Sequence, residues 1–394
     1  MIPKRLPFDQ AEYDRRLLMT RMAMALAGLD ALYVSDPSNM AWITGYDGWS
    51  FHMHQGVIVL QDADPIWWGR DQDTHGARGT VWMPNTSIIG YVDDYVQSTE
   101  QHPMEDLARH LDGLGVQNLG IEMDNYYFSA KAFSVLLQAL PNIGFADATG
   151  MVNLQRAIKS APEIAFMRKA VLISEKIMDG LIDRVKVGVP KNKVIAEACH
   201  DAILGVDDAW GDYPAMPPML SSGSDGGASH LTCDDRPFEA GEATFLKISG
   251  CYRRYHTPLG RTMFLGTPPD AMKHAEAALL EGLEAGINAA RAGNRACDIA
   301  NALALPLELA GIQGNARCGH SIGLSYPPDL SERTISLRAK DEIVLEPNMT
   351  FNFMPGLWVD NWGIEITESI RITEEGAAEV FCDRPREILS FLET

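Results

Sequence analysis

A chain of 394 residues is longer than a single hydrophobic core usually supports, which favours two domains. Acidic residues outnumber basic ones by 53 to 33, and a net charge of −20 disfavours contact with nucleic-acid phosphates. No segment approaches the roughly 20 apolar residues of a membrane span, and the first residues lack the apolar run of a secretory signal. The six cysteines have no paired spacing, which is typical of reduced thiols. We therefore expect a cytoplasmic globular protein with no nucleic-acid or membrane partner.

The first 150 or so residues alternate helical and strand patterns, as α/β domains do. An amphipathic helix is expected over 9–28, with Leu18, Met22 and Leu26 four residues apart on one face. Short strands are expected at 31–34, 56–60, 87–92 and 119–122. Helices are expected at 103–113 and 128–139.

The pattern changes near residue 150, where a long helix begins. Ser160 and Glu163 form a capping box around Pro162, and apolar residues follow on one face at helical spacing: Ile164, Met167, Val171 and Met178. Further helices are expected at 191–204, 269–291 and 296–310. Strands are expected at 243–250, 261–265, 342–346, 349–353, 363–366 and 369–373. We therefore predict an α/β domain over 1–155 and an α+β domain over 156–394, in which helices pack against a curved antiparallel sheet.

Three segments combine glycine, proline and ionisable residues without a regular period. They are Gly-His-Ser-Ile-Gly at 319–323, Glu-Pro-Asn-Met at 346–349 and Gly-Ile-Glu-Ile-Thr-Glu at 363–368. In these segments the chain resembles the pita-bread family of methionine aminopeptidase, prolidase, aminopeptidase P and creatinase. The resemblance covers nearly the whole chain and implies a pita-bread catalytic domain behind a creatinase-like N-terminal domain.

The peptidases of this family hold two metal ions with two Asp, one His and two Glu. The resemblance places these five positions at Lys247, Pro258, His320, Glu346 and Thr367. Three of the five ligands are therefore replaced, and one His with one Glu cannot hold a hard divalent ion. The resemblance thus implies a site without metal, and we expect no cofactor.

Creatinase also lacks a metal and relies on a histidine seventeen residues before the first metal position, which is His230 here. Creatinase has a glutamate where this chain has Gly260, so the substrate is not held as creatine is. The chain is more similar to the ectoine hydrolase group, in motifs such as Thr-Gly-Tyr-Asp-Gly-Trp-Ser-Phe at 44–51 and Cys-Tyr-Arg-Arg-Tyr-His at 251–256. That group carries an acidic residue where this chain has Lys247, so the lysine is a specialisation, marks another substrate, or is an altered residue.

Ectoine is a small zwitterion, a cyclic amidinium that bears a carboxylate. Opening its ring requires attack of water on the amidinium carbon and a proton for the departing nitrogen. The resemblance assigns amidinium binding to Glu346 and Glu365, and proton transfer to His230 and His320. Further substrate contacts are assigned to Trp49, Phe51, Lys247, Tyr255, His256 and Trp362, with the aromatic rings stacking on the cation.

Several alternatives remain open from the sequence. Glu365 and Glu368 point to opposite faces of a strand, so we expect Glu365 to face the site and Glu368 to face solvent. Lys247 either pairs with Glu346 or Glu365 or binds the substrate carboxylate. The first hypothesis is hydrolysis of ectoine, with hydroxyectoine as a second substrate, and the second is hydrolysis of another small guanidino or cyclic C–N compound. A non-catalytic binding protein is the third hypothesis. Creatinase-like enzymes form homodimers, which predicts a dimer with residues 45–55 near the neighbouring pocket.

Overall fold

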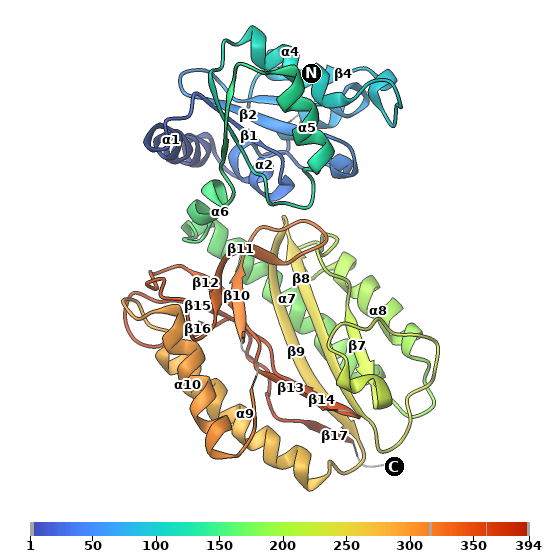
Figure 1. Cartoon of the computed structure of the whole chain (residues 1–394). Coiled ribbons are helices and arrows are strands. Elements are labelled where there is room, and N and C mark those ends of the chain that lie inside the picture. The colour runs from blue at the N-terminus through green and yellow to red at the C-terminus, as the bar shows by residue number, and fades with distance from the viewer. Residues whose placement is uncertain (1–3, 315–316, 360, 392–394) are drawn as a thin grey trace. The chain divides into compact units, whose positions relative to one another are not determined.

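The computed structural model describes residues 4–314, 317–359 and 361–391 and divides the chain into two compact units, Met1–Arg156 and Ala157–Thr394 (Figure 1). The boundary predicted from the sequence lies one residue earlier. In the described part of the chain, no helix has both the length and the apolar character needed to cross a membrane.

The first unit is built on a six-stranded mixed sheet in the order β4-β3-β2-β1-β5-β6. Strand β1 pairs antiparallel with β2 and parallel with β5, as expected for an α/β domain. The strands are β1 (Ala31–Val34), β2 (Gly56–Leu60), β3 (Ile66–Arg70), β4 (Ile88–Tyr91), β5 (Asn118–Ile121) and β6 (Gly144–Asp147). The helices are α1 (Gln10–Leu26), α2 (Pro37–Thr44), α3 (Thr74–Thr80), α4 (Pro103–Gly113), α5 (Ala130–Ala139) and α6 (Met151–Arg156).

Helix α1 buries a different face from the one predicted. The side chains of Leu18, Met22 and Leu26 are exposed to solvent. The buried face carries Arg16, whose guanidinium lies 4.1 Å from the ring centre of Phe8 and donates to the Trp42 carbonyl oxygen. An ion pair with Glu12 at 2.9 Å, ring stacking and this hydrogen bond offset the burial of the charge, so an arginine takes the inner face and the leucine row faces outward.

The described residues of the second unit form three sheets, in the orders β11-β10-β12-β15-β16, β13-β14 and β17-β9-β8-β7. Helices α7 and α8 cover one side of this strand-rich middle and α9 and α10 the other (Figure 1). The helices are α7 (Ala161–Arg184), α8 (Lys191–Leu204), α9 (Asp270–Ala289) and α10 (Ala296–Leu309). The strands are β7 (Met219–Ser222), β8 (Ala243–Tyr252), β9 (Tyr255–Leu265), β10 (Gly319–Ile322), β11 (Ser331–Leu337), β12 (Thr350–Phe353), β13 (Gly356–Val359), β14 (Trp362–Glu365), β15 (Glu368–Arg371), β16 (Glu379–Val380) and β17 (Leu389–Phe391). The predicted architecture, an α/β N-terminal domain followed by an α+β domain with helices on its sheets, is confirmed.

The long hairpin of β8 and β9 fixes which side chains can reach the interior of the second unit. Its register pairs Lys247 with Gly260 and Cys251 with His256. Residues at odd positions of β9 face α7: the Tyr255 hydroxyl donates to Glu163, in the capping box of that helix. Because side chains alternate along a strand, Lys247 and His256 share the opposite face.

Two predicted features of the second unit are wrong. Residues 342–346 do not form a strand, and Ile343 and Val344 are exposed in the loop before β12. Glu368 does not face solvent: it is fully buried, and its Oε1 accepts hydrogen bonds from Arg261 at 2.8 Å and Arg386 at 3.0 Å. Two guanidinium partners offset the desolvation of this carboxylate, which sequence alternation alone cannot reveal.

Candidate functional site

Lys247 lies in the middle of β8 with only 7% of its surface exposed. Its ammonium nitrogen is 2.9 Å from Oε1 of Glu365 and 3.5 Å from the sulfur of Met354. Of the two carboxylates predicted from the sequence as partners of this lysine, the structure therefore places Glu365 beside it. The pair is buried, where its Coulomb attraction is screened less than at the surface.

Glu365 ends β14 and is held from three directions. Its backbone N–H donates to the Thr262 hydroxyl at 3.0 Å, and its Oε1 accepts from the Thr367 hydroxyl at 2.6 Å as well as from Lys247. Gly260 allows this arrangement, because a Cβ atom built there would lie 2.7 Å from the Thr367 hydroxyl oxygen. The glutamate is thus fixed before any ligand binds, as a preorganised binding site requires.

His320, on β10, is paired with Asn352, which lies opposite it on β12. The Nδ1 atom of His320 is 3.1 Å from the Ser321 carbonyl oxygen, and its Nε2 atom is 3.1 Å from the Asn352 side-chain nitrogen. Burial lowers the pKa of His320 to about 4, so the ring is neutral near pH 7. Since a carbonyl oxygen can only accept, Nδ1 carries the proton and Nε2 accepts from the Asn352 amide.

This network leaves one buried acceptor unused. With its NH2 group turned toward His320 and the Met354 sulfur, Asn352 presents Oδ1 elsewhere, and that atom has no hydrogen-bond partner among the described residues. Asn352 is fully buried. An unpaired buried amide oxygen costs about 1–3 kcal/mol, which marks the atom as a candidate ligand contact.

The structure does not bring Glu346 to this cluster. Glu346 is exposed in the turn before β12, whereas Met354 directly follows the other end of that strand and contacts Lys247. Strand β12 carries Asn352 and Met354 inward and leaves Glu346 on the surface, and the amidinium contact expected at Glu346 stays a prediction. Phe351 and Phe353 point to the opposite side, into the core under α9 and α10.

The side chains that surround Lys247 do not fit a hard divalent metal ion. They offer one carboxylate, one imidazole, a hydroxyl and a thioether, and the lysine ammonium would repel a cation. Within residues 4–314, 317–359 and 361–391, no three His, Cys, Asp or Glu side chains are grouped as a metal site.

His230 and Trp362 lie on two segments that pack together. The short helix η5 (Gly223–Gly227) packs on β14, where a Cβ on Gly226 would lie 3.2 Å from the Cα of Trp362. His230 follows in the next loop, is exposed, and contacts the Ser229 hydroxyl through Nδ1 at 3.0 Å. The loop with His230 thus begins beside the strand that carries Glu365, although the structure shows no contact between these two side chains.

The other predicted substrate-binding residues of the second unit differ in accessibility. The Tyr255 hydroxyl is used by Glu163 at 2.7 Å, which gives this residue a structural partner. His256 is fully buried, and its Nε2 accepts from the backbone N–H of Ala215 at 2.9 Å. Its Nδ1 atom makes no hydrogen bond of good geometry among the described residues, although backbone carbonyl oxygens of Arg254 and Gly323 interact with the ring.

Trp49 and Phe51 belong to the first unit and are stacked together, with ring centres 4.8 Å apart. Trp49 is 57% exposed. Phe51 also lines a pocket of 370 Å³ with His54, His102 and Tyr127. Their predicted role in substrate binding stays a prediction.

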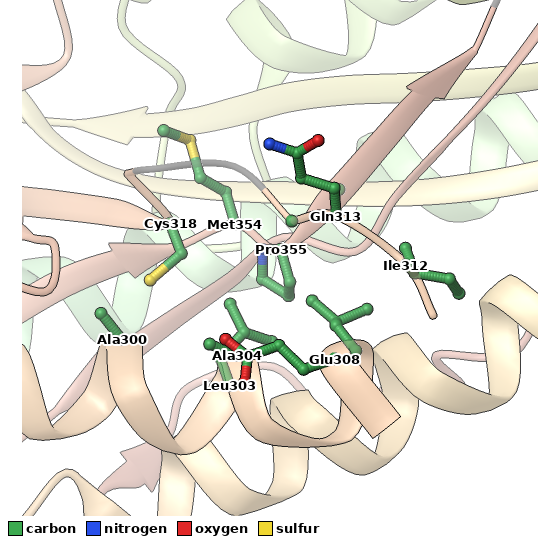
Figure 2. Close-up of a pocket in the computed structure, with 12 residues that line it drawn as sticks. Ala300, Leu303, Ala304, Glu308, Ile312, Gln313, Cys318, Met354 and Pro355 are labelled. Carbon is green, nitrogen blue, oxygen red and sulfur yellow. The ribbon is translucent and has the colours of Figure 1, made fainter. Parts of the chain in front are cut away.

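A second pocket, of 190 Å³, lies between α10 and the segment 354–356 (Figure 2). Its lining is mostly apolar, with Leu303 and Leu307 from the helix and Glu308 as its one carboxylate. Met354 lines this pocket and also contacts Lys247. None of the predicted site residues lines it, so we place the chemistry at the Lys247–Glu365 cluster instead.

Sequence reasoning missed Asn352 and Met354. The available signal was the alternation in Thr-Phe-Asn-Phe-Met at 350–354, where two aromatic core residues flank an asparagine. An amide at an inward position between buried rings is a polar group that needs a partner.

Comparisons with known proteins agree with this architecture. The profile of metallopeptidase family M24 matches residues 165–374, and that of the creatinase/prolidase N-terminal domain matches residues 16–158. The chain is 50% identical to the ectoine hydrolase of Halomonas elongata over 98% of this chain and 99% of the relative. It is 36% identical to an uncharacterised hydrolase/peptidase of Sinorhizobium fredii over 98% of both chains. The solved prolidase of Pyrococcus horikoshii superposes with a TM-score of 0.82 at 20% identity, covering 95% of this chain and all of that one.

Proposed function

The chain belongs to metallopeptidase family M24 and carries the creatinase/prolidase N-terminal domain, and from this premise we propose that it is a metal-independent hydrolase that opens the cyclic amidine ring of ectoine. The product is N-acetyl-diaminobutyrate, and hydroxyectoine is a second substrate in this proposal. The observation that carries it is the buried Lys247–Glu365–Thr367 cluster, which supplies a fixed carboxylate among side chains that do not match the ligands of a hard divalent ion. The full-length similarity to an ectoine hydrolase supports the choice of substrate.

In the proposed reaction, Glu365 accepts a hydrogen bond from the amidinium and orients the ring. The oxygen of a water molecule forms a bond to the amidinium carbon, and the water proton passes to His230. The C–N bond of the resulting tetrahedral species then breaks, and His230 returns the proton to the departing nitrogen. As the carbonyl forms, the hydroxyl proton passes to the released amine, so one water is consumed and a neutral amide with a free ammonium group is formed, without any change in oxidation state.

His230 is favoured over His320 as the proton carrier. The Nε2 lone pair of His320 is engaged by the Asn352 amide, and burial lowers the pKa of His320 to about 4. Such a ring is a poor base near neutral pH. His230 is exposed on the loop that follows η5, and η5 packs on the strand that carries Glu365. His320 therefore serves to position Asn352.

The test uses protein that has been exhaustively chelated and checked by elemental analysis. Ectoine, hydroxyectoine and creatine are then supplied separately, and the products are followed by NMR. We expect N-acetyl-diaminobutyrate from ectoine, no turnover of creatine, and loss of activity in Glu365→Gln. Activity that disappears on chelation and returns with manganese or zinc would contradict the metal-independent scheme, and failure to open ectoine would contradict the substrate.

We further propose a cytoplasmic homodimer in which Trp49 and Phe51 reach the partner's site. An exposed tryptophan stacked on a second ring is typical of a contact surface, and the six cysteines, all unpaired, suit a reducing compartment. Light scattering at micromolar concentration tests the dimer, and a monomer would refute it. Trp49→Ala is expected to raise KM for ectoine, with Trp210→Ala, another exposed tryptophan, as the control.

A further inference from the structure

Glu365 uses only one of its two carboxylate oxygens within the described part of the protein. Its Oε1 accepts from the Thr367 hydroxyl at 2.6 Å and lies 2.9 Å from the Lys247 ammonium. The other oxygen, Oε2, has no hydrogen-bond partner among the described residues, although the side chain is only 2% exposed. A carboxylate oxygen in such surroundings is costly to leave unpaired, so Oε2 is the atom at which we expect an N–H group of a ligand.

Met354 brings an apolar side chain to this carboxylate. Its sulfur lies 3.5 Å from the Lys247 ammonium and 3.4 Å from the side-chain nitrogen of Asn352. Methionine is usually flexible, but a thioether sulfur is a weak acceptor, and two N–H donors on the sulfur favour one orientation of the side chain. Met354 is half-buried, whereas Lys247 and Asn352 are buried. Part of the thioether surface therefore remains open to a ligand.

The printed contacts also fix how far the thioether lies from the carboxylate. The lysine ammonium is 3.5 Å from the sulfur of Met354 and 2.9 Å from Oε1 of Glu365, so the sulfur and Oε1 are no farther apart than the sum of these two distances. Figure 2 shows the Met354 side chain extending away from Leu303 and Ala304 of α10. The thioether therefore belongs to the Lys247–Glu365 cluster.

The substrate of the proposed reaction carries an alkyl group at the reacting carbon. Ring opening of ectoine gives an N-acetyl product, so the substituent on the amidinium carbon is the methyl of that acetyl group. A ring N–H that donates to Oε2 of Glu365 is bonded to the same carbon, and its methyl group then lies about 4 Å from Oε2. This distance brings the methyl group within reach of the thioether of Met354.

From these contacts we propose that Met354 determines the size of the alkyl substituent that the site accepts on the amidinium carbon. Its thioether packs on the methyl group of the substrate while a ring N–H donates to Oε2 of Glu365. The assignment rests on the proposed function and deepens it, because it makes the site selective for cyclic amidines that yield an acetyl group. Hydroxyectoine carries the same methyl group and is accepted in the same way.

The test compares ectoine with two homologues that carry a hydrogen or an ethyl group in place of the methyl group. Their products are N-formyl, N-acetyl and N-propionyl compounds, which NMR distinguishes. The measured quantity is the ratio of kcat/KM between two substrates on the same protein sample. This ratio does not depend on the fraction of folded enzyme, so a purely structural effect of a substitution leaves it unchanged.

We expect the wild type to prefer ectoine to either homologue by about tenfold or more, the usual effect of one methylene group in a fitted apolar site. Met354→Ala should raise the ratio of the ethyl homologue to ectoine by about tenfold, because the shortened side chain leaves room for the larger group. Met354→Val, a smaller truncation, should change the ratio in the same direction by less.

Met349→Ala is the matched control. Met349 directly precedes β12, and its sulfur also accepts an N–H, from the Glu346 backbone at 3.4 Å. Its side chain packs in the core with residues of α9 and α10. The same chemical change at this position should therefore leave the ratio between the homologues as it is in the wild type.

A ratio that stays unchanged in Met354→Ala and Met354→Val would overturn the assignment while leaving ectoine hydrolysis intact. An equal change in Met349→Ala, or a wild-type protein that opens the ethyl homologue as well as ectoine, would overturn it too. If the wild type does not open ectoine, both this assignment and the proposed function fail. Thermal unfolding checks that each variant is folded at the assay temperature.

Discussion

The Lys247–Glu365 pair makes a quantitative prediction about the stability of the second unit. The two charges are 2.9 Å apart, and their side chains are 9% and 2% exposed. Lys247→Met removes the ammonium and leaves a buried carboxylate with the Thr367 hydroxyl as a donor. Breaking a buried pair in this way costs about 3–5 kcal/mol, since the remaining charge is desolvated and unpaired.

The double variant Lys247→Met with Glu365→Gln should recover most of that loss. A neutral amide beside a methionine leaves no isolated charge, and replacement of a whole buried pair is often close to neutral. We therefore expect a coupling energy of about 3 kcal/mol in the double-mutant cycle. Lys169→Met is the matched control: its pair with Asp208 is also short, at 2.6 Å, but lies at the surface, where such pairs contribute about 1 kcal/mol or less.

Hydrogen exchange of peptides from β8 and β9 reports on the second unit alone, and urea unfolding gives the total change. The reasoning is refuted if the two single substitutions are additive within about 0.5 kcal/mol. It is equally refuted if Lys247→Met destabilises no more than Lys169→Met, because the buried pair would then contribute no more than a surface one.

Three further predictions concern the histidines and Tyr255. His230→Ala should lower kcat by about a hundredfold or more while thermal unfolding stays unchanged, because the side chain is exposed; turnover close to that of the wild type would exclude His230 as the proton carrier. Burial lowers the pKa of His256 to about 3 in the folded protein. Between about pH 6.5 and 3 the unfolded chain therefore binds a proton on this residue that the folded chain does not bind. The free energy of unfolding should fall on acidification through this range by up to about 1.4 kcal/mol per pH unit. His256→Gln should reduce that slope in urea titrations, while the lowered pKa values of His54 and His320 retain part of it; an unchanged slope would refute the lowered pKa of His256. Tyr255→Phe should lower the free energy of unfolding by about 1–2 kcal/mol, because the hydrogen bond to Glu163 is lost, and should leave kcat for ectoine unchanged. A large fall in kcat would show that Tyr255 contacts the substrate.

Features that depend on neighbours in the chain could be predicted from the sequence. The helix expected at 191–204 is α8 with the same bounds, and the capping box of Ser160 and Glu163 is present at the start of α7. Such features rest on local hydrogen bonds and on the spacing of apolar residues within a few turns. Lys247 stands at one of the five metal positions of the family. Because an ammonium group repels a cation, the identity of this residue in the sequence already predicts a site without metal.

Only the tertiary structure decided which distant side chains meet. Glu346 and Glu365 were equivalent candidates in the sequence, yet one precedes β12 in an exposed turn and the other ends β14 beside Lys247. Asn352 gained a role because the pairing of β10 with β12 sets it against His320. Register between strands far apart in sequence determines these contacts, and a shift of one residue would turn every side chain to the other face of its sheet. The candidate residues could therefore be identified from the sequence, whereas the contacts among them depend on how the strands pair.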